Sequence, residues 1–169
     1  MWLSDFNLVL PDRLVERGSL RIEAGRIAKI AEHPVAGGVA GDGLHLFAGF
    51  IDIHGDMIEQ EIEPRPRVEL PMDLALGTLD ARLAAAGVTT AYASVSFSRG
   101  AKDGAVRSFD HTSRVIRGVR DGTKDARVDH KVHARFDITF DNAVGVIGDL
   151  IRDSMVDLVS LMDHTPGQG

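Results

Sequence analysis

The sequence contains no cysteine and has few aromatic residues among its 169 positions. The absence of cysteine excludes disulfides, thiolate metal sites and cysteine nucleophiles, so histidine and carboxylate side chains must hold any metal. No apolar run approaches the roughly 18 residues that a membrane helix needs, and the N-terminal segment lacks the basic start of a targeting signal. We therefore expect a cytoplasmic protein with no membrane partner.

An excess of positive charge is also absent. The 19 Lys and Arg residues stand against 25 Asp and Glu residues, which leaves a formal net charge of -6. A nucleic-acid partner is not expected from this balance, and any anion-binding site must be local. No P-loop, Gly-x-Gly-x-x-Gly or Gly-x-Ser-x-Gly motif occurs, which disfavours nucleotide kinases, dinucleotide-dependent enzymes and serine hydrolases.

The chain divides by pattern into two parts, residues 1–46 and 47–169. The first part contains short alternating segments at 6–10, 19–23 and 26–31, separated by turns, and predicts a small β-meander or a piece of a β-sandwich. Its expected core includes Leu8 and Leu20 from the first two strands and Ile27 and Ile30 from the third.

The second part alternates between strand-like and helix-like segments, which predicts an α/β fold with a parallel sheet. The expected strands are 44–53, 88–95, 131–138 and 156–162, a polar loop is expected at 56–71, and the expected helices are 72–86, 106–119 and 141–151. A complete (β/α)₈ barrel needs about 250 residues, so four strands make a partial TIM-type barrel. Because half a barrel leaves two strand edges unpaired, we expect either a truncated piece of a longer protein or half of a homo-oligomer.

The end of the first barrel-type strand carries the sharpest local motif, His54-Gly55-Asp56. Residues two apart in a strand point to the same side, so His54 and Asp56 are expected to project together where α/β enzymes place their sites. An imidazole and a carboxylate placed side by side can both bind the same divalent cation. The alternative is structural: His54 caps the strand and Asp56 begins a turn.

The third barrel-type strand is expected to carry a polar face, because His133, Arg135 and Asp137 alternate with apolar residues. We expect this face to look into the site, with Asp137 as a further metal ligand. Arg135 would hold a phosphate or orient a carboxylate. An Arg–Asp pair that is merely buried in the end of the sheet explains the same pattern.

Two further motifs follow strands. Arg65 and Arg67 lie in a loop stiffened by two prolines after the first barrel-type strand, and guanidinium groups suit phosphate binding; exposed surface arginines are the alternative. His164 follows the fourth strand as His54 follows the first, which makes it a candidate substrate contact, and a simple turn is the other interpretation.

Together, the runs GLHLFAGFIDIHGD at 43–56 and AAGVTTAYASV at 85–95, placed after a β-meander, resemble the amidohydrolase superfamily of metal-dependent barrel hydrolases. Members usually show Pro-Gly-Phe-Ile-Asp-x-His-x-His there, whereas this chain has Ala48 for the proline and Asp56 for the second histidine. That variant, with EPRPR at 63–67 and SLMDHTPGQ at 160–168, is similar to the diphosphatase branch of the carbon-phosphorus lyase pathway.

The resemblance implies a hydrolase of phosphonate catabolism that releases pyrophosphate from a ribose phosphonate carrying a 5-triphosphate. It implies a divalent metal, with Zn²⁺ as the first choice and Mn²⁺ or Fe²⁺ as alternatives, held by His54 and Asp56. Arg65, Arg67, Arg135 and His164 would contact the small phosphorylated substrate, and the proton acceptor would lie beyond Gly169. Cleavage of a cyclic amide or another C–N bond, or a non-catalytic fragment or assembly module, remain the alternatives.

Overall fold

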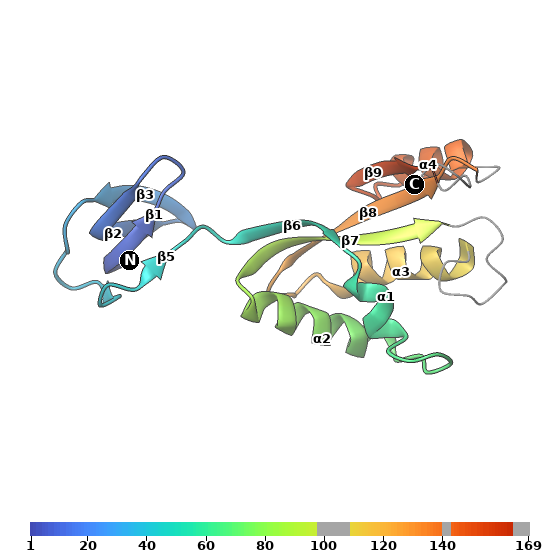
Figure 1. Ribbon diagram of the computed structural model, residues 1–169, viewed down its shortest axis with the longest axis horizontal. Helices are drawn as coiled ribbons and strands as arrows, with labels where there is room; N and C mark the ends of the chain where they lie inside the picture. Colours follow the sequence, from blue (N-terminus) through green and yellow to red (C-terminus); the bar gives the residue numbers. More distant parts are fainter. Residues whose placement is uncertain (98–108, 140–142, 164–169) are drawn as a thin grey trace. The chain divides into compact units, whose positions relative to one another are not determined.

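The computed structural model describes residues 1–97, 109–139 and 143–163. The chain forms two compact units, Met1–Ala48 and Gly49–Gly169. Figure 1 shows their strands and helices in chain order. None of the helices within the described ranges is both long enough and apolar enough to cross a membrane.

The first unit is a small sheet in which the central strands run antiparallel. The strands are β1 (Trp2–Val9), β2 (Leu14–Glu23), β3 (Arg26–Ala31), β4 (Val39–Ala40) and β5 (His45–Leu46). They are arranged in the order β3-β2-β1-β4, with β5 also paired to β1. Leu8, Val15 and Leu20 form its buried core. The expected contribution of Ile27 and Ile30 is wrong: they are 64% and 37% exposed, because β3 is an edge strand whose outer side is open to solvent.

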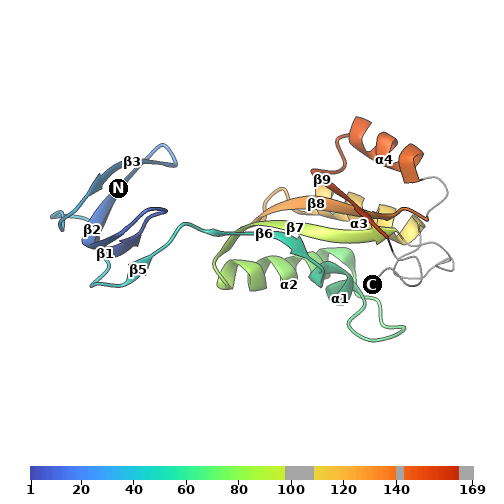
Figure 2. The same ribbon diagram turned by 45° about the horizontal axis from the view of Figure 1, so that its top comes forward.

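The second unit is a curled sheet of four parallel strands with helices between them, which confirms the predicted partial (β/α)₈ fold class (Figures 1 and 2). The strands, in sheet order, are β6 (Phe50–Gly55), β7 (Val88–Phe97), β8 (Asp129–Asp137) and β9 (Leu158–Met162). The helices are α1 (Met57–Ile62), α2 (Met72–Ala85), α3 (Phe109–Gly122) and α4 (Ala143–Arg152). Val106 and Asp141, expected in the second helix and at the start of the third, lie outside the described residues.

Two predicted boundaries in this region are wrong. The apolar run at 44–53 is not one strand, because the division between the two units falls after Ala48 and splits the run into β5 and β6. The expected polar loop after β6 contains α1, which is held in place by burial of Ile58 and Ile62. The predicted helix at 72–86 is confirmed as α2, and Gly87 follows it with a left-handed φ of 80°.

The two faces of the sheet differ in chemistry because side chains alternate along each strand. On β7 and β8 one set packs against the helices and forms the main core, namely Ala91, Ala93, Val95, Phe97, Val132, Ala134 and Phe136. The residues between them, including Ser94, His133 and Arg135, therefore lie on the opposite face. This polar face is where the site is found.

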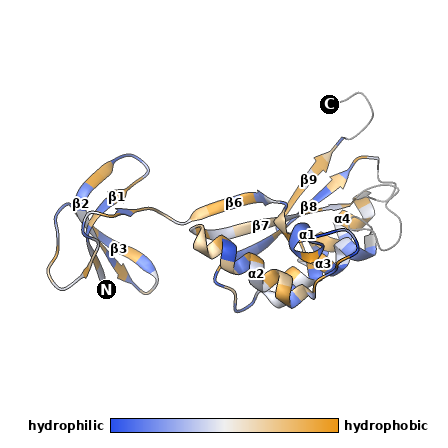
Figure 3. Cartoon of the chain, turned by 60° about the horizontal axis from the view of Figure 1, so that its bottom comes forward, coloured by the Kyte–Doolittle hydropathy of each residue, from blue (hydrophilic) through white to orange (hydrophobic). Residues whose placement is uncertain are grey.

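The outer strands β6 and β9 are rich in apolar residues (Figure 3). Phe50, Ile51 and Ile53 on β6 are 57%, 63% and 62% exposed, and Leu161 on β9 is 67% exposed. Within the described chain, β6 is an edge strand that pairs with β7 alone and leaves these apolar side chains exposed.

One buried carboxylate ties α2 to the start of β8. Asp80 accepts hydrogen bonds from the backbone N–H groups of Arg127 and Val128 at 3.2 and 3.0 Å. It also lies 3.2 Å from the Arg127 guanidinium and from His130 Nε2. Because α2 and β8 are far apart in the sequence, this contact fixes a helix to the sheet end opposite the site.

Candidate functional site

The end of β6 is irregular at the predicted motif. Asp52 pairs with Ala91 and Gly55 pairs with Ala93, so β6 has one more residue than β7 between these two points. Such a bulge bends a strand and re-aims its side chains, and bulges are common beside active sites. The Asp52 carboxylate accepts a hydrogen bond from the His54 backbone N–H at 3.0 Å, which stabilises the bend locally.

The bend brings His54 and Asp56 together. The distance from His54 Nε2 to Asp56 Oδ1 is 3.5 Å, and the two side chains are 47% and 57% exposed. Asp56 stands at the start of α1 but makes no side-chain cap hydrogen bond there, so its carboxylate is not committed to the helix. The motif therefore presents an imidazole nitrogen and a carboxylate oxygen to the same space at the carboxyl end of the sheet.

Arg135 joins this pair from β8. Its Nη1 lies 3.2 Å from Asp56 Oδ1, and its side chain is only 21% exposed. Arg135 therefore pairs with a carboxylate in the described chain, and its expected binding of a phosphate stays a prediction. A guanidinium has five N–H donors, so the contact with Asp56 leaves donors for an anionic ligand.

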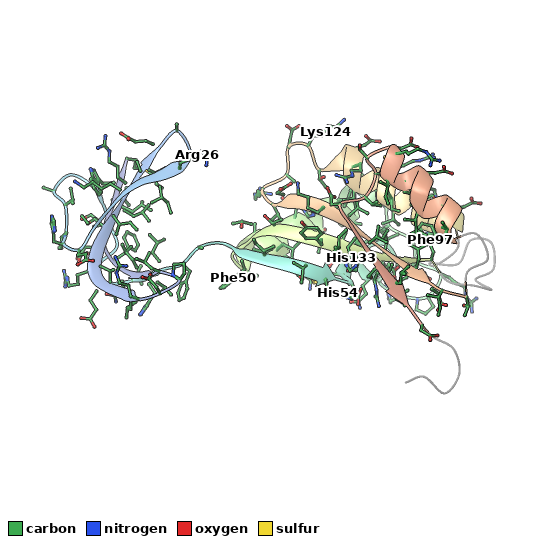
Figure 4. The ribbon with its side chains drawn as sticks, turned by 90° about the horizontal axis from the view of Figure 1, so that it is seen from above. Arg26, Phe50, His54, Phe97, Lys124 and His133 are labelled. Carbon is green, nitrogen blue, oxygen red and sulfur yellow. The ribbon has the colours of Figure 1, made fainter. Side chains whose placement is uncertain are left out.

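His133 lies beneath the pair in the same strand as Arg135. Its ring centroid is 5.4 Å from that of His54, and the two rings meet edge to face. Figure 4 labels both side chains, seen from above. Burial lowers the pKa of His133 below its ordinary value, and the nearby His54 and Arg135 lower it further. The hydrogen bond to the Ile53 backbone and the charge of Asp56 act in the opposite direction and are outweighed. The neutral imidazole is therefore favoured at this position.

The remaining predicted residues are placed less centrally. Asp137 is 6% exposed at the end of β8, and its Oδ1 accepts hydrogen bonds from the N–H and hydroxyl of Thr139 at 2.9 and 2.5 Å. Arg65 and Arg67 are exposed in a tight turn after α1, in which Arg67 has a φ of 65°. Within the described residues neither arginine forms a hydrogen bond or an ion pair with His54, Asp56 or Arg135. His164 lies outside the described residues.

The ligand pair fits a divalent cation only in part. Two ligands around a tetrahedral ion with bonds of about 2.0–2.1 Å lie roughly 3.3 Å apart, close to the observed 3.5 Å between His54 Nε2 and Asp56 Oδ1. Across residues 1–97, 109–139 and 143–163, no three His, Asp or Glu side chains gather closely enough to hold a metal. A cation at this position therefore needs further ligands from outside the described residues.

Sequence reasoning missed the two serines that complete the polar face. Ser94 Oγ lies 3.0 Å from His133 Nδ1, and Ser160 Oγ lies 2.9 Å from His133 Nε2. The alternation of Tyr92, Ser94 and Ser96 against apolar neighbours was the available signal. It could not show which serine faces which histidine, because that depends on the pairing between strands.

Comparison with known proteins gives one strong sequence match. The chain is 31% identical, over 172 aligned residues and 99% of its length, to alpha-D-ribose 1-methylphosphonate 5-triphosphate diphosphatase of Escherichia coli (strain K12). The match covers 45% of that protein, so the chain spans just under half of its curated relative's length. No family model matches the chain.

A solved structure agrees in fold. The N-acetyl-D-glucosamine-6-phosphate deacetylase from Mycobacterium smegmatis superimposes with a TM-score of 0.51 at 15% identity, over 95% of this chain and 49% of that enzyme. At this identity the likeness concerns the fold alone. The sequence match confirms the expected resemblance to the ribose phosphonate triphosphate diphosphatase over part of that enzyme's length.

Proposed function

We propose that this chain is the N-terminal part of a metal-dependent hydrolase of the amidohydrolase superfamily. The whole protein would hydrolyse alpha-D-ribose 1-methylphosphonate 5-triphosphate to the 5-phosphate and pyrophosphate. The observation that carries the proposal is the 31% identity over 99% of the chain, an aligned range that spans the region of His54 and Asp56. The convergence of these two side chains at the carboxyl end of the sheet supports it independently.

His54 and Asp56 would hold the cation, together with ligands outside the described residues. Asp137 is a weaker candidate, because its Oδ1 already accepts two hydrogen bonds from Thr139. A bound divalent cation lowers the pKa of its water and neutralises charge on phosphoryl oxygens, which is the chemistry that phosphoanhydride hydrolysis requires. Zn²⁺ suits a mixed nitrogen and oxygen ligand set, and Mn²⁺ or Fe²⁺ are alternatives.

Arg135 would bind and orient the substrate's phosphates. It is already fixed at 3.2 Å from Asp56, so it can bind an anionic oxygen beside the cation without ordering a flexible side chain first. In the free protein the same guanidinium partly neutralises Asp56. Arg65, Arg67 and His164 are secondary candidates, since they follow the ends of β6 and β9.

The first test is metal content and pyrophosphate release by the full-length protein. The variants His54→Ala and Asp56→Ala are expected to lose both bound metal and turnover of the triphosphate substrate. His45→Ala and Asp121→Ala, which change an exposed histidine and an exposed aspartate elsewhere, are the matched controls and should keep both. Metal retained in stoichiometric amount by both site variants would refute the ligand assignment.

A second measurement separates this proposal from cleavage of a cyclic amide. The triphosphate substrate and a hydantoin-like compound are compared in the wild type and in Arg135→Met. Because only the triphosphate needs a guanidinium partner, its KM is expected to rise at least tenfold in the variant. Turnover of the hydantoin, with none of the triphosphate, would favour C–N bond hydrolysis instead.

A further inference from the structure

One histidine connects the neighbouring strands beneath the site. His133 is 4% exposed even though it lies on the sheet face opposite to the helices. Its two ring nitrogens lie 3.0 Å from Ser94 Oγ on β7 and 2.9 Å from Ser160 Oγ on β9. A neutral imidazole has one donor and one acceptor nitrogen, and a serine hydroxyl can serve either. Both nitrogens are therefore hydrogen-bonded, so His133 is not placed to act as a ligand itself.

The same ring also reaches β6. It packs edge to face with the His54 ring, at an interplanar angle of 81°. Ile53 and His54 are the two residues that the bulge removes from regular pairing with β7. Backbone pairing with β7 holds the rest of β6 in place, whereas contact with His133 holds this bulged end.

We propose that His133 is a positioning residue for the His54–Asp56 pair. By holding the bulged end of β6 against β7, β8 and β9, it sets where the His54 ring points and thereby how well the pair binds a divalent cation. The inference rests on the proposed function, because it requires His54 and Asp56 to bind metal. It assigns His133 no contact with substrate, since the residue acts through His54.

The test measures binding of Co²⁺ alone to the full-length protein. His133→Leu removes both serine hydrogen bonds and the ring contact, and it fills the position with an apolar side chain of moderate size. Loss of a partner that orients a metal ligand typically weakens metal binding by about 10–100-fold, and we expect a loss in that range. The visible absorption spectrum of bound Co²⁺ should change as well, because it reports ligand geometry. His133→Gln, which keeps a donor and an acceptor, should recover part of the affinity.

Phe136→Leu is the matched control for general destabilisation. Phe136 lies on the same strand but faces the helices and is fully buried, so its substitution disturbs the core without contacting the site. It is expected to lower the unfolding midpoint and to leave the Co²⁺ affinity and spectrum unchanged. If His133 had a purely structural role, His133→Leu would give the same result as this control: a lower unfolding midpoint with unchanged Co²⁺ affinity and spectrum.

The outcomes separate this inference from the proposed function. Wild-type Co²⁺ affinity and spectrum in His133→Leu would overturn the inference, while loss of Co²⁺ binding in His54→Ala would still uphold the metal site. Retention of Co²⁺ binding in both His54→Ala and Asp56→Ala would instead refute the ligand assignment of the proposed function. If His133→Leu does not fold, Ser94→Ala and Ser160→Ala each remove one hydrogen bond to the ring. Unchanged affinity and spectrum in both serine variants would likewise overturn the inference.

Discussion

Outside the site, Asp80 is the polar residue whose substitution is expected to reduce the free energy of unfolding most. Its side chain is 7% exposed, and its two oxygens accept the hydrogen bonds from Arg127, Val128 and His130 that join α2 to β8. Asp80→Ala leaves the Val128 N–H and the His130 ring nitrogen buried without this partner. Each unsatisfied buried group costs about 1–3 kcal/mol, whereas the exposed Arg127 side chain is readily hydrated. We therefore expect a loss of about 3 kcal/mol in the free energy of unfolding.

The stabilisation is also expected to depend on pH. Burial by itself raises the pKa of the Asp80 carboxyl, but the hydrogen bonds from Val128, Arg127 and His130 outweigh burial and hold the pKa below its ordinary value of 3.8. Because the folded state binds this proton more weakly than the unfolded state, the contribution is fully present above pH 3.8. It is lost as the pH falls through the lower pKa of the folded protein. The stability difference between the wild type and Asp80→Asn should therefore shrink only below about pH 3.8.

The assay is urea unfolding, monitored by the circular dichroism signal of the helices. This signal reports on the second unit because every described helix lies there. Asp121→Ala serves as the control, since Asp121 is 79% exposed and pairs only loosely with Lys124. Its effect should stay within about 0.5 kcal/mol. If Asp80→Ala were no more destabilising than Asp121→Ala, the reasoning from buried, unsatisfied groups would fail. A wild-type advantage that grew on acidification would contradict the direction of the pKa shift.

Three further substitutions test the packing of the second unit by urea unfolding. Gly49→Ala should destabilise this unit by about 1–3 kcal/mol, because the new Cβ would collide with the Thr89 side chain. An unchanged unfolding midpoint would show that β7 shifts to accommodate the new Cβ. Gly77→Ala is the matched contrast, since Gly77 lies in α2 with open space around it, and a gain of about 0.5–1 kcal/mol is expected. Phe136→Ala should cost about 3–5 kcal/mol, because the ring is fully buried and stacked 4.5 Å from Phe97; a loss under about 1 kcal/mol would contradict that packing.

The parallel α/β class and the helix at 72–86 were predictable because they depend on local hydrophobic periodicity and on a glycine that can adopt a left-handed conformation. The short helix α1 was not predictable in this way. It has six residues and no side-chain cap hydrogen bond, and it is stabilised by burial of Ile58 and Ile62 against the core. A helix of that length has too few internal hydrogen bonds to form alone, so the sequence carries little signal for it.

The candidate site likewise has features that the local sequence predicts and contacts that it does not. The sequence was enough to predict the motif around His54 and Asp56 and the polar alternation that includes Arg135, since each belongs to one segment of the chain. The contact of Arg135 with Asp56, and of His133 with Ser94 and Ser160, joins segments up to 79 residues apart. No local pattern specifies such contacts.

The sequence by itself determined which side chains point to which face of each strand, because the two-residue period of a strand is a property of the backbone. The tertiary structure alone decided which of those side chains meet. The register between β7 and β8 places Ser94 opposite His133, and the extra residue in β6 turns His54 toward both His133 and Asp56. Register and bulges are fixed by long-range packing of the sheet against its helices, and a one-residue slip would send every polar group to the opposite face.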